Sequence, residues 1–96
     1  MLRVLHGHFM KLTLNQAIKK GVEAHQAGDI KEAEKLYKYV LQSQPANPDA
    51  NHNMGILAVE MGNIQDSLTF FRAALISGPN VSQFWLSYIS ALINVG

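Results

Sequence analysis

Apolar and polar positions along the chain follow a helical period. Between residues 30 and 41, apolar or small side chains recur at the three- and four-residue spacing of one helix face. The positions are Ile30, Ala33, Leu36, Tyr37, Val40 and Leu41. No stretch sustains the period-two alternation of a half-buried strand, so the chain is predicted to be all-α.

Capping and turn residues divide the chain into five predicted helices. Thr13 opens a capping box before a first helix at about residues 14–27, and Gly28 follows where a left-handed residue ends a helix. Asp29 and Asn63 are predicted to cap the second and fourth helices. The prolines that end one helix or begin the next are Pro45, Pro48 and Pro79.

The chain repeats itself at a constant interval. Residues 14–47 and 48–81 align without gaps and share seven identities, where average residue usage would give roughly two. The shared residues of the first unit are Gly21, Ala24, Gly28, Ile30, Leu41, Ser43 and Pro45. A third, partial unit occupies residues 82–96.

This pattern resembles the tetratricopeptide repeat, a helix–turn–helix unit of about 34 residues. The second unit shows the family's small and aromatic positions as Asn51-x-x-Met54-Gly55-x-x-Ala58, Ser67-x-x-x-Phe71 and Pro79. The third unit has Trp85 and Tyr88 but carries Ile89 where the family has glycine. The resemblance covers residues 14–96 and implies a right-handed α-solenoid of antiparallel helix pairs, with about two and a half repeats.

The resemblance also divides the chain into an N-terminal extension, residues 1–12, and a repeat domain, residues 13–96. Met10 is a candidate natural start. The extension lacks the apolar run and the cleavage site of a secretory signal. No apolar run approaches the roughly 20 residues of a membrane span, so we expect a cytoplasmic chain with no membrane partner.

Composition and charge narrow the chemistry. The net charge is +1 with acids and bases interleaved, so no basic face for nucleic acid or anionic lipid is expected. The absence of cysteine excludes disulfides and thiolate chemistry. No nucleophile stands beside an oriented base, and His6 and His8 alone are too few for a metal site. We therefore expect no catalytic residue, no metal, no cofactor and no enzymatic activity.

In the family, the first helices of successive units line a concave groove that binds a protein or peptide. Carried onto this chain, the groove positions are Asn15, Ile18, Lys19, Val22, His25, Gln26, Asp49, His52, Asn53, Ile56, Glu60, Gln83, Leu86, Ser87 and Ser90. His25 and His52 are expected to be solvated there. The alternative is that all these residues are simply the solvated edges of helices.

One family subclass grips acidic chaperone tails with lysine, asparagine and arginine at set groove positions. The corresponding residues here are Ile18, Val22, Asn53, Gln83 and Ser87. Only Asn53 matches, and a terminal carboxylate would find no cationic partner. The mixed apolar and amide lining instead favours an extended neutral segment. The resemblance to some sugar-transferase repeat domains implies that Asn53 bonds to its backbone.

The fifth helix is apolar on nearly all sides, which predicts burial on two faces. The chain lacks the helix that would cover the second face in the family. We therefore expect the isolated chain to form a homo-oligomer through this face. The predicted self-association residues are Phe84, Trp85, Tyr88, Ile89, Leu92 and Ile93.

The sequence as a whole predicts a non-catalytic interaction or scaffold module. The alternative comes from a likeness of the AHQAGDIKEAEKLY and PDANHNMG stretches to N-terminal repeat blocks of bacterial multidomain glycosyl-, sulfo- or methyltransferases. In such an enzyme the repeats would position substrate or dimerise the chain.

Overall fold

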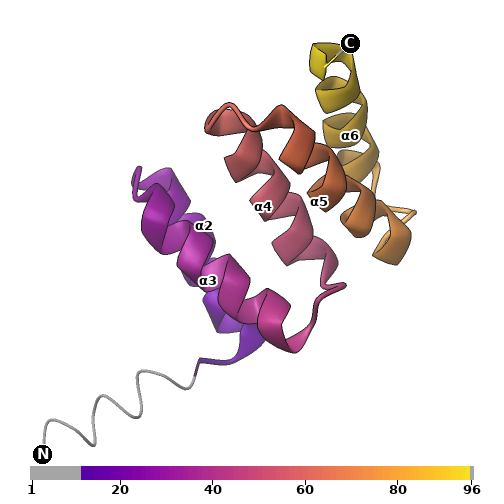
Figure 1. Cartoon of the computed structure of the whole chain (residues 1–96). Coiled ribbons are helices and arrows are strands. Elements are labelled where there is room, and N and C mark those ends of the chain that lie inside the picture. Colours follow the sequence, from indigo (N-terminus) through magenta and orange to yellow (C-terminus); the bar gives the residue numbers. More distant parts are fainter. Residues whose placement is uncertain (1–11, 96) are drawn as a thin grey trace, which may run out of the picture.

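The computed structural model describes residues 12–95, which form five α-helices and, within that range, no strand. The helices are α2 (Leu14–Gln26), α3 (Ile30–Ser43), α4 (Pro48–Glu60), α5 (Ile64–Ser77) and α6 (Ser82–Val95). Figure 1 shows α2 with α3 and α4 with α5 as two neighbouring hairpins, with α6 alongside α5. The predicted all-α helical repeat is confirmed.

The predicted N-terminal extension lies outside the described residues except for Leu12. The backbone carbonyl of Leu12 accepts a hydrogen bond of 2.7 Å from the Tyr39 hydroxyl. Its side chain packs on a core cluster that contains Ala17 and Val40. Leu12 is therefore tied to the first hairpin.

The first hairpin begins and turns where its sequence predicts. The Thr13 hydroxyl accepts from the Gln16 backbone N–H at 3.0 Å, and the Gln16 side chain accepts from the Thr13 N–H at 2.9 Å, which completes the capping box. Gly28 and Gly62 end the first helix of each hairpin with φ of 84° and 83°. A side chain is strained in that left-handed conformation, so glycine permits the tight turn.

The two predicted N-cap residues, Asp29 and Asn63, differ in their hydrogen bonds. The Asp29 carboxylate accepts from the Glu32 N–H at 3.2 Å. Asn63 occupies the predicted N-cap position of α5, but its side chain makes no capping hydrogen bond. The amide of Asn47 does cap α4, since its oxygen accepts from the Ala50 N–H at 2.9 Å, and Asp66 places an acidic side chain in the first turn of α5.

Each hairpin is held by an aromatic ring lying against a glycine of the opposite helix. A Cβ atom on Gly21 would lie 2.5 Å from a ring carbon of Tyr37, and a Cβ atom on Gly55 would come closer still to Phe71. The helices can approach this closely only because these two positions carry no side chain. Two small residues of the second helices are also fully buried: Ala33 and Ser67.

The apolar interior continues from one hairpin to the next. Tyr37 of α3 packs in one cluster with Met54 and Leu57 of α4. Leu75 of α5 packs in another with Phe84 of α6. Each hairpin thus buries apolar surface that it could not cover alone, as stacked repeats do.

The stack is curved. α2 approaches α4 and α4 approaches α6, whereas no Cα atom of α3 lies within 8 Å of a Cα atom of α5. The first helices of the units are therefore closer together than the second helices, and α2, α4 and α6 line the inner, concave side. The right-handed sense of the superhelix stays a prediction from the family.

The packing around Gly55 yields a test of the fold. We expect Gly55→Ala to lower the free energy of unfolding by about 1–3 kcal/mol, because the new methyl group overlaps the Phe71 ring. This loss should prevail over the roughly 1 kcal/mol that alanine gains over glycine in helix propensity. Urea unfolding measures the change, with Gln65→Ala on the exposed side of α5 as the control. A variant as stable as the wild type would contradict the close approach.

Candidate partner-binding groove

The predicted groove residues lie on the three helices of the concave side, and they differ in exposure. Eight are exposed: Asn15, Lys19, Gln26, Asp49, Glu60, Gln83, Leu86 and Ser90. Six are half-buried: Ile18, Val22, His25, Asn53, Ile56 and Ser87. His52 alone is buried.

A hollow of about 260 Å³ lies between α4 and α6. Six of the residues that line it were predicted as groove residues: Ile56, Glu60, Gln83, Leu86, Ser87 and Ser90. The others are Val59, Phe71, Ala91 and Asn94. This volume is below the roughly 300–1,000 Å³ typical of small-molecule pockets.

Two of the lining residues that the sequence prediction missed follow from the repeat itself. Val59 holds the position of His25 in the next unit, and Asn94 holds the position of Glu60 in the next unit. Both His25 and Glu60 were predicted groove positions. Adding the repeat length of 34 residues to each predicted position would have found their equivalents in the next unit. Phe71, one of the family's aromatic positions, is almost fully buried and also lines the hollow.

His52 connects α4 to α6 and is not the solvated groove residue that was expected. Its Nε2 lies 2.8 Å from the Ser87 hydroxyl oxygen. Its ring centroid lies 5.6 Å from that of Phe71 and 4.8 Å from that of Phe84. Burial lowers the pKa of His52 below its ordinary value of 6.5, while the nearby Asp49 carboxylate acts in the opposite direction. His52 is thus a packed, hydrogen-bonded element of the α4–α6 interface.

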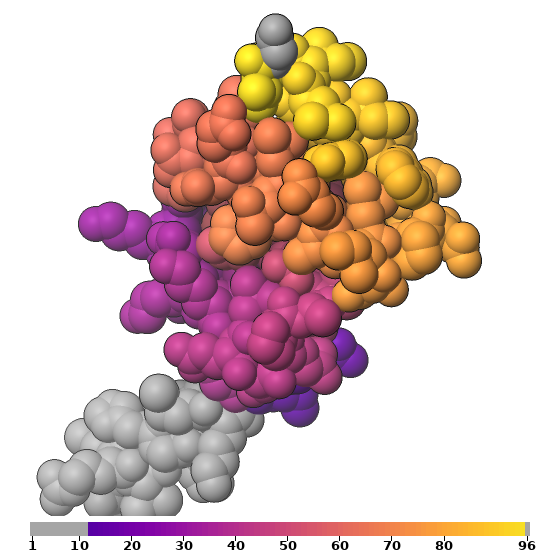
Figure 2. Space-filling model, turned by 45° about the vertical axis from the view of Figure 1, so that its right-hand side comes forward, coloured from indigo at the N-terminus to yellow at the C-terminus, as the bar shows by residue number. Residues whose placement is uncertain are grey.

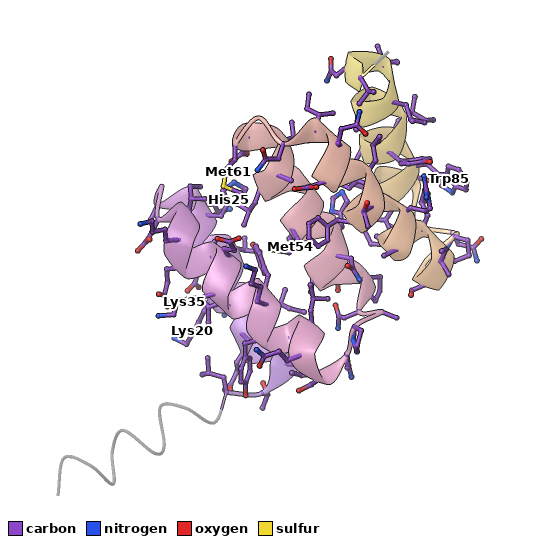
Figure 3. All side chains as sticks on the ribbon, viewed as in Figure 1. Lys20, His25, Lys35, Met54, Met61 and Trp85 are labelled. Atoms are coloured by element: carbon purple, nitrogen blue, oxygen red, sulfur yellow. The ribbon has the colours of Figure 1, made fainter. Side chains whose placement is uncertain are left out.

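His25 makes the equivalent connection between α2 and α4. Its Nε2 lies 2.7 Å from Oε1 of Glu60. In Figure 3 His25 points from α2 toward the end of α4, where Met61 follows the helix. Each histidine contacts a residue 35 positions later, so the two partners of a pair occupy nearly the same place in successive units. His25 is half-buried and keeps part of its side chain in solvent, but the sequence did not predict its contact with Glu60.

The outer face of α6 carries large exposed apolar side chains. Trp85 is 46% exposed, Ile89 49%, Leu92 43% and Ile93 74%. Phe84, predicted on this face, is only 4% exposed because it packs against Leu75 and under the His52 ring. Figure 2 shows α6 at one end of the packed helices with α5 beside it, and Figure 3 shows Trp85 pointing outward.

The hollow offers apolar surface and hydrogen-bonding groups. Within residues 12–95, no group of three or more histidine, aspartate or glutamate side chains is placed to hold a metal ion. His6 and His8 lie outside the described residues. None of the helices α2 to α6 has the length and the apolar character that crossing a membrane requires.

The lowered pKa of His52 predicts how stability depends on pH. The unfolded chain binds more protons than the folded one just below pH 6.5, so the free energy of unfolding should fall as the pH falls through this range. His52→Gln removes the titrating ring and keeps a side chain that can bond to Ser87, so it should lose less stability on acidification. Urea unfolding at about pH 7.5 and 5.5 brackets the ordinary histidine pKa.

His25→Gln is the matched control for this prediction, since it leaves His52 in place and should keep most of the acid sensitivity. If the wild type and His52→Gln lost equal stability on acidification, His52 would not be the source of the pH dependence.

The comparison with known proteins agrees with the geometry. A family model described as tetratricopeptide repeat matches residues 24–88. No curated protein matches the chain. The matched residues run from the second half of α2 into α6 and include both hairpin turns with left-handed glycines. The chain belongs to the tetratricopeptide repeat family.

Proposed function

We propose that this chain is a non-catalytic interaction module that holds a segment of a partner protein in the concave groove between α4 and α6. Tetratricopeptide repeats generally mediate protein–protein interaction and are typically non-catalytic. The observation that carries the proposal is the hollow of about 260 Å³, because it lies on the side where the family binds ligands.

The surface of the hollow suits a peptide. Ile56, Phe71 and Leu86 offer apolar contact, and the side chains of Gln83 and Asn94 offer amide donors and acceptors. Asn53, half-buried on the same helix as Ile56, is proposed to bond to the backbone of the partner segment. If the chain is the N-terminal part of a larger transferase, the same groove would hold a protein substrate or a neighbouring subunit.

Blocking the hollow tests this function. Ligands are selected from a displayed library of random ten-residue peptides, and their affinities are measured by fluorescence anisotropy. Ser90→Trp places a large ring on an exposed lining position and should weaken binding at least about tenfold, the size of a typical hot-spot loss.

Gln42→Trp is the control for this experiment, because it adds the same ring to an exposed position of α3, away from the lining residues. Peptides whose affinity is the same for the wild type and for Ser90→Trp would show that they bind elsewhere, and the proposed groove function would fail.

The outer face of α6 supports a second proposal, that the isolated chain self-associates. Trp85, Ile89 and Leu92 are the repeat equivalents of Asn51, Gly55 and Ala58, which are all buried in α4. The face therefore corresponds to one that the second helix of a hairpin covers. Ile89, however, replaces the glycine that permits the close approach in the first two units. Large apolar side chains in this place suit looser packing against a second copy of α6.

A charged substitution tests the self-association. Sedimentation equilibrium at micromolar concentration should give a mass above 10.6 kDa for the wild type. Ile93→Glu should restore the monomer, because it would bury an unpaired carboxylate in the interface. Ile76→Glu is a closely matched control, since Ile76 is 76% exposed on α5 and Ile93 is 74% exposed on α6. A monomeric wild type would contradict this proposal.

A further inference from the structure

The groove between α4 and α6 is long enough for a short extended segment. Its lining residues on α6 run from Gln83 to Asn94. Successive helical residues rise 1.5 Å each, so this stretch corresponds to about 16 Å along the helix axis. An extended peptide covers that length with about five residues.

One end of the groove is electrically negative. Glu60 is the single charged side chain among the described residues that line the hollow. It is the last residue of α4, and Asn94 holds the equivalent place near the end of α6. Both helices therefore direct the negative ends of their dipoles to this region, and neither has a basic residue in its last turn.

The net charge of this half of the chain has the same sign. Residues 48–95 contain three acids (Asp49, Glu60 and Asp66) and one base (Arg72), for a net charge of −2. Residues 14–47 contain five lysines and four acids, for a net charge of +1. The half of the chain that forms the hollow is thus the acidic half.

His25 fixes the carboxylate at the edge of the groove. Its contact of 2.7 Å engages one oxygen of Glu60, Oε1, while the Glu60 side chain remains 49% exposed. A carboxylate that is already oriented loses less conformational freedom when a ligand cation binds to it.

From these features we infer that the groove selects partner segments that place an apolar side chain in the hollow and a lysine or arginine beside Glu60. The inference rests on the proposed groove function and makes its partner more specific. It replaces the neutral segment favoured by the sequence, because Glu60 lines the hollow whereas the other charged groove positions predicted from the sequence, Lys19 and Asp49, do not.

The ten-residue peptides selected on the wild type provide the probe. Lysine and arginine should be enriched in them near an apolar residue. Each chosen peptide is then synthesised in three forms, with lysine, glutamine or glutamate at the enriched basic position. Glu60→Gln should weaken the lysine form about two- to fivefold, as expected for a partly exposed ion pair, and leave the glutamine form unchanged. The effect on the lysine form should shrink at high salt.

Charge reversal and a matched control sharpen the test. Glu60→Lys should bind the glutamate form better than the lysine form, which reverses the preference of the wild type. Glu23→Gln removes the same charge from an exposed position of α2 that does not line the hollow, and it should leave all three affinities as they are.

The outcomes separate this inference from the groove function. Peptides that Ser90→Trp blocks, but that lack basic residues or respond equally to Glu60→Gln and Glu23→Gln, would overturn the inference and leave the groove function standing. Peptides that Ser90→Trp does not block would overturn both.

Discussion

The close approach of an aromatic ring to a bare glycine backbone is the contact on which the rest of the molecule depends. Tyr37 lies over Gly21 in the first hairpin, and Phe71 lies over Gly55 in the second. This contact sets the separation of the two helices in a hairpin, and its recurrence at the same position of the next unit gives both hairpins the same geometry. Two hairpins of the same geometry can stack through one continuous core, and the stacking brings the first helices together on the concave side.

The two aromatic positions are not chemically equal. The Tyr37 hydroxyl is buried and has no hydrogen-bond partner among the described residues, and its pKa is raised by burial and by the charge of Glu60. Phe71 fills the same place in the next unit with no polar atom. The contact thus needs a flat ring of this size, and the phenol oxygen adds nothing to the packing that the structure shows.

Much of the fold was predictable because the signals that determine it are local or periodic. The helix ends depend on Thr13, Gly28 and Gly62, which act within a few residues of themselves. The groove positions follow from the 34-residue repeat, and Val59 and Asn94 could have been found in the same way.

The prediction failed where two side chains from different units meet. His25 and His52 have polar side chains on the concave side of a helix, a pattern that indicates solvent exposure in a sequence. Their partners, Glu60 and Ser87, come 35 positions later in the chain. Such a pairing depends on the spacing of neighbouring repeats, which no single helix specifies. Phe84 was misplaced for the same reason, since its burial requires α5.

Packed hairpins create a concave surface, and we propose that a partner segment binds on it. Backbone amide NMR spectra of the isotope-labelled chain, recorded with and without a selected ten-residue peptide, locate the bound segment. If the segment binds on the concave surface, the largest shift changes should fall on the facing residues of α4 and α6, including Ile56, Leu86 and Ser90. Shift changes concentrated on the outer faces of α3 and α5, with α4 and α6 unaffected, would contradict it.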